Sequence, residues 1–189
     1  IAKGLDFPNV TLVGVLNADT ALNLPDFRSS ERTFQLLTQV AGRAGRAEKA
    51  GQVIIQSYNP NHYAIAFAKN QDYEGFYAYE MRVRRQLAYP PYYFTVGITL
   101  SHKIEEVVIK KSYEVLNILR SGLSDKVQIL GPTPKPIART HNLFHYQILL
   151  KYRFEDHLPQ VLNQILDYTQ ERENQDLRVS IDNEPQSFM

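Results

Sequence analysis

The stretch Phe94-Thr95-Val96-Gly97-Ile98-Thr99-Leu100-Ser101 decides the fold of the second half of the chain. Its apolar residues alternate with small or polar ones, which is typical of a β-strand with one buried face. The same alternation returns over residues 144–152 and around 178–182. Residues 127–130 add a short apolar run that ends at Gly131-Pro132. The sequence therefore predicts four strands after residue 93.

Two further segments separate these strands and have a helical period. Residues 104–119 and 158–169 place their apolar side chains on one helical face, and Pro159 lies in the first turn of the second segment. The resulting order is βαββαβ, which predicts an α+β ferredoxin-like domain over residues 93–189 with both helices on one face of the sheet.

The other face of this sheet is predicted to be polar and net basic, and therefore a candidate contact surface for nucleic acid or protein. It lacks the aromatic residues on which an RNA-recognition module stacks bases, which argues against that mode of readout. Residues 135–142 read as a basic, proline-containing loop beside the same face. The residues predicted to bind nucleic acid or a partner are Lys3, Lys135, Arg139, His145, Gln147, Lys151 and Arg153.

Residues 1–58 read as part of an α/β lobe. Residues 10–16 and 52–56 are apolar runs without alternation, as in strands that are buried on both faces. An amphipathic helix between them begins near Ser30, with Ser29 or Ser30 as its N-cap. The order strand, helix, strand predicts a parallel crossover. Two strands cannot close a core, so we expect exposed apolar surface, local disorder or self-association here.

Residues 59–92 are predicted to form a helical linker that Asn59-Pro60-Asn61 caps. Its aromatic residues are interpreted as core packing rather than as a surface for base stacking.

The octet Gln39-Val40-Ala41-Gly42-Arg43-Ala44-Gly45-Arg46 carries the chemistry of this lobe. On a helix, Gln39, Arg43 and Arg46 would share one stripe. Two guanidiniums without an acidic neighbour suit a phosphate chain, and the glycines Gly42 and Gly45 allow a close backbone approach. The alternative is a solvated Gln/Arg face at the end of a helix.

This octet resembles motif VI of superfamily 2 helicases, and residues 1–13, with Gly4-Leu5-Asp6 before a strand, resemble motif V. The chain also contains Asn17-Ala18-Asp19, Pro25-Asp26-Phe27-Arg28, Tyr89-Pro90-Pro91-Tyr92 and Gly131-Pro132-Thr133-Pro134. Together, these motifs are similar to the PriA (primosomal protein N′) family of bacterial replication-restart DNA helicases. The resemblance implies that residues 1–58 are part of a RecA-like helicase lobe 2.

The resemblance also implies a role for each motif residue. Arg43 and Arg46 would reach the γ-phosphate of ATP, one of them as the arginine finger, and Gln39 would orient the attacking water. Gly4 and Asp6, with Gly42 and Gly45, would belong to the nucleotide-binding site.

The remaining parts of such a motor are expected outside this chain. No Gly-Lys-Thr/Ser phosphate loop occurs in the 189 residues, so we expect a C-terminal fragment that has no ATPase activity alone. ATP and Mg²⁺ would be bound mainly by a first lobe. The family's zinc site needs cysteines, and this chain has none, so no metal site is expected here.

The implied function is that of an ATP-dependent 3′-to-5′ DNA helicase that recognises stalled forks and initiates primosome assembly. Its partners would be branched or forked DNA, single-stranded DNA-binding protein and other primosome proteins, in the cytoplasm. Two alternatives stay open, a non-catalytic DNA- or protein-binding scaffold and a helicase-like protein that acts on RNA.

Composition fits a soluble globular protein of this kind. The chain is 43% hydrophobic and 22% charged, with a net charge of +1 and no apolar run long enough to cross a membrane. The charge is uneven, because residues 91–154 hold nine Lys/Arg against four Asp/Glu, whereas residues 155–189 hold two against eight. The basic stretch is either a footprint for a polyanion or one half of a neutralised domain.

Overall fold

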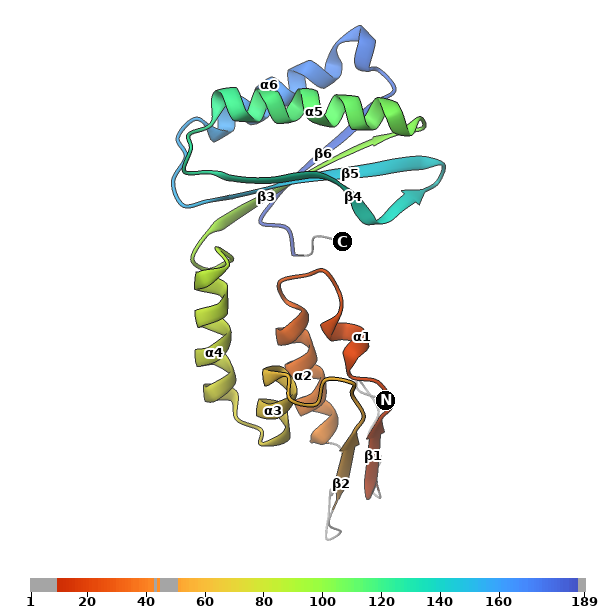
Figure 1. Cartoon of the computed structure of the whole chain (residues 1–189), viewed down its shortest axis with the longest axis vertical. Coiled ribbons are helices and arrows are strands. Elements are labelled where there is room, and N and C mark those ends of the chain that lie inside the picture. The colour runs from red at the N-terminus through yellow and green to blue at the C-terminus, as the bar shows by residue number, and fades with distance from the viewer. Residues whose placement is uncertain (1–9, 43, 45–50, 187–189) are drawn as a thin grey trace. The chain divides into compact units, whose positions relative to one another are not determined.

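The computed structural model describes residues 10–42, 44 and 51–186, and the chain divides into two compact units between Val83 and Arg84. Within the described residues, no helix is long and apolar enough to cross a membrane. The first unit contains a two-stranded parallel sheet with helices, and the second contains a four-stranded antiparallel sheet with helices. The chain is thus a mixed α/β protein (Figure 1).

The elements of the first unit follow the predicted order of strand, helix and strand. They are β1 (Leu12–Val15), α1 (Asp19–Leu22), α2 (Ser29–Ala41), β2 (Gln52–Ile55), α3 (Tyr63–Lys69) and most of α4 (Tyr73–Gln86). The strands β1 and β2 pair in parallel, with Leu12 opposite Gln52 and Val15 opposite Ile55. This confirms the predicted parallel crossover.

The predicted helix caps of this unit are wrong in detail. The N-cap of α2 is Arg28 and makes no side-chain cap bond, so Ser29 and Ser30 are already helical. The turn before α2 is held instead by Asp26, whose carboxylate accepts from the Arg28 backbone N–H at 2.9 Å and from Arg32 Nη1 at 2.9 Å. Likewise, α3 is capped by His62, whose Nδ1 accepts from the Ala64 N–H at 3.2 Å, and not by Asn59-Pro60-Asn61.

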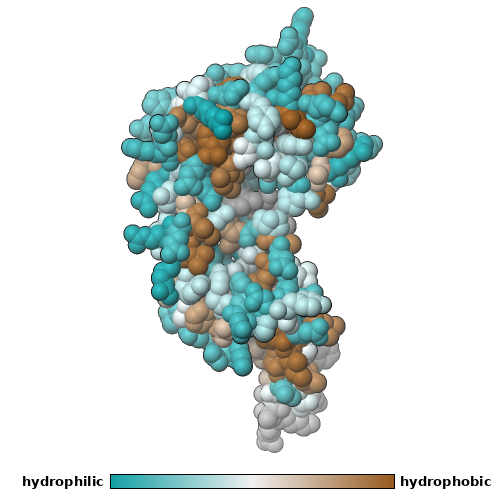
Figure 2. Space-filling view, in the orientation of Figure 1, coloured by the Kyte–Doolittle hydropathy of each residue, from teal (hydrophilic) through white to brown (hydrophobic). Residues whose placement is uncertain are grey.

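The strands β1 and β2 are not buried on both faces, contrary to the prediction. Leu12 and Ile54 are exposed, whereas Val13, Val15 and Ile55 are half-buried. Hydrophobic atoms gather at the β1–β2 end of the unit (Figure 2). The expected exposed apolar surface is therefore present.

The core of the first unit lies between α2, α3 and α4. Phe34 and Leu37 of α2 are buried together with Ala64, Ile65 and Phe76. The rings of Phe34 and Phe76 stack with centroids 4.1 Å apart. Phe76 thus agrees with the interpretation as core packing, whereas Tyr73, Tyr77 and Tyr79 of α4 are exposed. The stack also fixes which side of α2 faces inward.

The second unit has the predicted alternation of strands and helices. After the end of α4 come β3 (Phe94–His102), α5 (Glu105–Gly122), β4 (Gln128–Thr140), β5 (Leu143–Tyr152), α6 (Leu158–Gln170), a 3₁₀ turn (Arg172–Asn174) and β6 (Arg178–Asn183). The sheet order is β4-β5-β3-β6, and every neighbouring pair is antiparallel. Both α5 and α6 lie on one side of this sheet (Figure 1).

The alternation seen in the sequence sets the core of this unit. Val96, Ile98 and Leu100 of β3 and Ile148 and Leu150 of β5 are fully buried under the helices. Their intervening neighbours lie on the opposite face, because successive strand residues point to opposite sides.

The strand β4 is far longer than the predicted run over 127–130. It continues through Gly131 and Pro132 to Thr140, with shifts of register against β5, so residues 135–140 are strand and not loop. Gly131 allows this, because its φ is +97° and an added Cβ would lie 2.6 Å from the Gln147 carbonyl oxygen. The hairpin turn itself is His141-Asn142, both with positive φ, as a two-residue hairpin connection requires.

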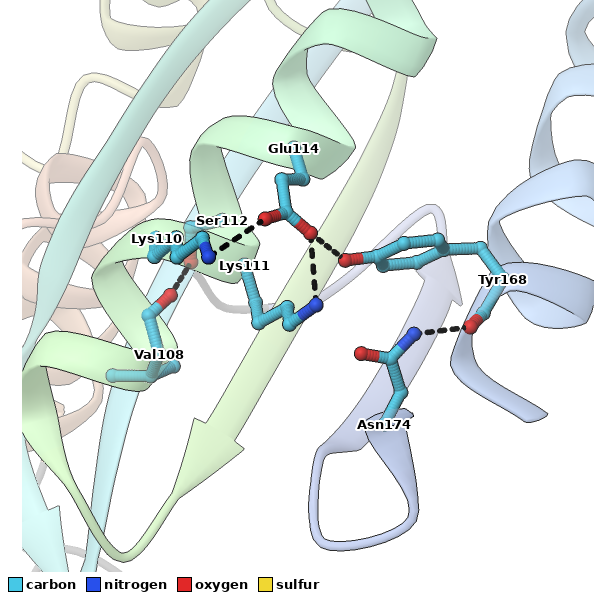
Figure 3. A network of polar contacts seen from close by, with 7 residues as sticks. All are labelled: Val108, Lys110, Lys111, Ser112, Glu114, Tyr168 and Asn174. Carbon is cyan, nitrogen blue, oxygen red and sulfur yellow. Dashed lines mark hydrogen bonds and ion pairs between the residues drawn. The ribbon is translucent and has the colours of Figure 1, made fainter. Parts of the chain in front are cut away.

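A polar network joins α5 to α6 on the helical side of the unit (Figure 3). The Glu114 carboxylate accepts from Lys111 Nζ at 2.9 Å and from the Tyr168 hydroxyl. The Tyr168 hydroxyl, followed by Lys111, lowers the pKa of Glu114. The buried Asn174 donates to the Tyr168 carbonyl oxygen at 2.6 Å. These contacts hold the end of α6 in place.

Candidate functional site

The predicted nucleotide-binding octet begins on the last turn of α2. Gln39 is exposed on that turn, and Gly42 is the C-cap, with its N–H bonded to the Thr38 carbonyl oxygen at 3.1 Å. The helix ends at Ala41, before the two arginines. The other predicted motif residues lie outside the described part of the chain: Lys3, Gly4, Asp6, Arg43, Gly45 and Arg46.

At the other edge of the two-stranded sheet, where β1 and β2 end, the structure forms a small hollow of about 140 Å³. Two loops from distant parts of the sequence build it. Its lining residues are Leu16, Asn17, Asp19, Gln56, Ser57 and Tyr58. None of these was predicted as a site residue, although Asn17 and Asp19 belong to a motif that contributed to the family resemblance.

Asp19 holds these two loops together. Its carboxylate accepts from the Tyr58 N–H at 2.9 Å, the Ser57 hydroxyl at 2.8 Å and the Asn59 N–H at 3.4 Å. The Tyr58 N–H makes the largest contribution to lowering the pKa of this carboxyl. Asp19 is buried and has several donors, so its role is to order the rim of the hollow.

In the second unit, the sheet face opposite the helices is polar, as predicted. The strand registers place Thr99 between Gln147 and Ser180, and Ser101 between His145 and Arg178. Arg178 and Arg153 are exposed, whereas Gln147 and His145 are half-buried. This face therefore brings together several of the predicted contact residues on adjacent strands.

His145 is held by hydroxyl groups on both sides of its ring. The Ser101 hydroxyl lies 2.7 Å from Nδ1, and the Thr140 hydroxyl lies 2.7 Å from Nε2. The imidazole thus ties β3, β5 and the end of β4 together. Each ring nitrogen can donate or accept, depending on the tautomer.

Lys151 does not face solvent, which corrects its predicted place on the contact surface. Its side chain is buried with 4% exposure for the residue, and its Nζ donates to the Leu87 carbonyl oxygen at 3.0 Å. The same Nζ lies 3.5 Å from the ring centroid of Tyr89. Burial lowers the pKa of this amine. Lys151 therefore anchors the segment after α4 to the sheet, and this contact could not be read from the sequence.

The arginines that flank this surface also use aromatic partners. Arg153 lies over the ring of Tyr93 at 4.7 Å, and Arg139 lies over Phe144 at 4.8 Å. Arg139 is nevertheless exposed near the hairpin tip, and Lys135 is half-buried along β4. Lys135 and Arg139 are thus positioned along β4 instead of lying in a loose loop, and Arg153 directly follows β5.

Residues 85–186 match the protein family described as the primosomal protein N C-terminal domain. The chain belongs to this family. The match covers the second unit almost completely, so the four-stranded sheet with its two helices is the fold of this domain.

Curated relatives carry the similarity beyond the PriA C-terminal domain. The replication restart protein PriA of Bacillus subtilis is 50% identical over 190 residues, covering 100% of this chain and 24% of that protein. PriA of Synechocystis is 45% identical over 152 residues, covering 80% of this chain and 18% of that protein. PriA of Chlamydia pneumoniae is 40% identical over 151 residues, covering 80% and 20%. The chain spans about a quarter or less of the length of these relatives.

The resemblance to the PriA family that the sequence motifs indicated is thus confirmed. The Bacillus subtilis match includes residues 1–84, where the octet lies. The described residues contain no group of three or more His, Cys, Asp or Glu side chains that could hold a metal ion.

Proposed function

We propose that this chain is part of an ATP-dependent DNA helicase that moves 3′ to 5′, recognises stalled replication forks and initiates primosome assembly. Fifty percent identity to a PriA protein over the whole chain is the observation that supports this most directly. The relatives are replication restart proteins by name, so the motor activity, its substrate and its partners are the proposed part.

The first unit would be part of a RecA-like lobe 2 that completes an ATP site. Arg43 and Arg46 would approach the γ-phosphate, and Gln39 would orient the attacking water. Gly4 and Asp6, with Gly42 and Gly45, would contribute to nucleotide binding. The exposed position of Gln39 at the end of α2 supports a ligand on that side. ATP and Mg²⁺ would be bound mainly by another lobe of the longer protein, and zinc would also be held elsewhere.

The second unit would adopt a ferredoxin-like arrangement and act as the DNA- or protein-contacting domain. Its element order and its strand order β4-β5-β3-β6 support the fold. Its exposed cations Arg139, Arg153 and Arg178 support a polyanionic partner. Forked DNA, single-stranded DNA-binding protein and other primosome proteins would meet the longer protein in the cytoplasm.

Replacing Arg43 tests the motor in the full-length protein. Arg43→Ala should lower ATP turnover by about 10³-fold, because an arginine finger stabilises the charge of the transferred phosphoryl group. Steady-state hydrolysis in the presence of forked DNA gives the rate. Lys103→Ala, at an exposed turn of the second unit, is the control and should leave turnover unchanged. Turnover near wild type in Arg43→Ala would remove the finger assignment.

A further inference from the structure

The hollow at the ends of β1 and β2 has the position and the lining of a ligand site. In parallel α/β sheets, ligands bind outside the carboxyl ends of the strands, which is where this hollow lies. The octet begins at the end of α2, and α2 runs back toward the start of β2. The hollow is therefore at the edge opposite the end of α2, where the octet begins.

Its rim carries two large side chains that the described chain leaves in solvent. Tyr58 is 93% exposed and Leu16 is 82% exposed. Among the exposed large hydrophobic residues of the described chain, only Phe154, at 86%, lies between these two values. A planar ring and an aliphatic side chain beside one hollow form a surface on which a flat apolar group can stack.

The floor of the hollow is polar and has a fixed shape. Asn17 Oδ1 accepts from the Asp19 N–H at 2.9 Å. Because this bond uses the oxygen of the Asn17 side-chain amide, the NH₂ group of that amide is the donor for a ligand. Gln56 adds a second amide at the end of β2, where its backbone N–H is bonded to Val15. Because Asp19 binds the loop of Ser57 and Tyr58, both sides of the hollow are ordered before any ligand arrives.

The lining decides the chemistry of the ligand. It contains the carboxylate of Asp19 and neither lysine nor arginine, so it disfavours phosphate. Side-chain amides can both donate to and accept from the edge of a nucleobase, and Tyr58 can stack on its face. A volume of about 140 Å³ is well below that of a pocket for a drug-sized molecule and suits one flat group.

We propose that this hollow receives one unpaired nucleobase of a DNA strand, stacked on Tyr58 and hydrogen-bonded by Asn17 and Gln56. The inference rests on the proposed function, since a DNA helicase holds a separated strand. It adds a contact that reads bases instead of phosphates to the first unit.

The test compares two oligonucleotides of equal length on the full-length protein, an oligo(dT) strand and an abasic strand. Both carry the same phosphates, and only one carries bases. Fluorescence anisotropy gives each affinity for wild type, Tyr58→Ala, Tyr58→Phe and Asn17→Ala. Tyr77→Ala, an exposed tyrosine of α4 outside the hollow, is the matched control.

Tyr58→Ala should weaken binding of oligo(dT) by about tenfold, because stacking of one base is lost, and leave binding of the abasic strand unchanged. Tyr58→Phe should retain the wild-type affinity, and Asn17→Ala should weaken only oligo(dT). Tyr77→Ala should match wild type. The assignment is overturned by equal losses on both strands, or by no loss with Tyr58→Ala.

A free nucleotide is the other source of a base, and competition with thymidine monophosphate separates the two. In one outcome, micromolar thymidine monophosphate displaces oligo(dT) from wild type, and a similar concentration does not displace it from Tyr58→Ala. The occupant of the hollow is then a free nucleotide, and the strand assignment fails. A wild-type protein without DNA-stimulated hydrolysis would contradict the proposed function instead, whatever the outcome at Tyr58.

Discussion

Asp19 is a buried carboxylate that makes the stability of the first unit depend on pH. Hydrogen bonds from Tyr58, Ser57 and Asn59 favour its ionised form, so its pKa is lower in the folded chain than in the unfolded chain. The unfolded carboxyl takes up its proton near pH 4. The stability from Asp19 is therefore complete above that pH and is lost as the pH falls through the folded pKa.

We expect Asp19→Asn to be less stable than wild type at neutral pH, because the amide NH₂ would face hydrogen-bond donors. The difference should shrink as the pH falls below about 4, where wild type loses the contribution of the carboxylate. Denaturant unfolding at a series of pH values measures it. Glu74→Gln, at an exposed position of α4, is the control and should follow the wild-type profile. A difference that is constant with pH would contradict this account.

At the scale of elements, α5 and α6 can approach closely because Gly122 has no side chain. A Cβ added at Gly122, the last residue of α5, would lie 2.5 Å from Val161 Cγ2. Alanine forms helix better than glycine by about 1 kcal/mol, which alone would stabilise the variant. Val161 is buried in α6, so the clash outweighs this gain.

Gly122→Ala should therefore lower the free energy of unfolding by about 1–3 kcal/mol, as overpacking of a core does. In the double variant with Val161→Ala, the added methyl group should cost less than it does alone, because the clashing atom is gone. Denaturant unfolding of all four members of this cycle measures the coupling. Strictly additive changes in free energy would show that the two helices do not meet at these residues.

Alternation was the most informative signal in the sequence. Residues 94–101 predict β3 and its buried side because the core lies on a single face. The length of β4 could not be predicted, since Gly131 and the prolines after it break the pattern, although a strand at the edge of a sheet needs only one partner. The predicted helix caps were wrong for two different reasons. Ser29 and Ser30 already lie inside α2, after a turn that Asp26 holds, and His62 caps α3 in place of the asparagines.

The sites were less predictable than the strands. The burial of Lys151 depends on Leu87 and Tyr89, which are more than sixty residues away in the sequence. The hollow likewise needs residues 16–19 and 56–58, which only the parallel pairing of β1 and β2 brings together. Local sequence patterns carry no information about such contacts between residues that are distant in the sequence.

For the whole molecule, the charge distribution predicts how DNA binding responds to salt. Four cations of the second unit lie along the β4–β5 hairpin, on the polar face of the sheet or directly after β5: Lys135, Arg139, Arg153 and Arg178. If all four neutralise phosphates of a forked duplex, log K should fall with log[salt] with a slope of about −3 to −4.

Salt titrations of forked-DNA binding by this chain test the prediction. Arg178→Ala should weaken binding at low salt and reduce the slope by about 1. Arg120→Ala, an exposed change on α5 across the sheet, is the matched control and should leave the slope as in wild type. No binding at low salt would leave the second unit with a protein-contacting role.

The prolines of β4 have a consequence for the behaviour of the protein in solution. Pro132, Pro134 and Pro136 lie in an edge strand and have no N–H to offer to an incoming chain. Such an edge is a poor template for a further strand, and prolines are one way in which natural sheets avoid joining edge to edge. We therefore expect that replacing these prolines would open this edge to pairing with a strand of a second chain.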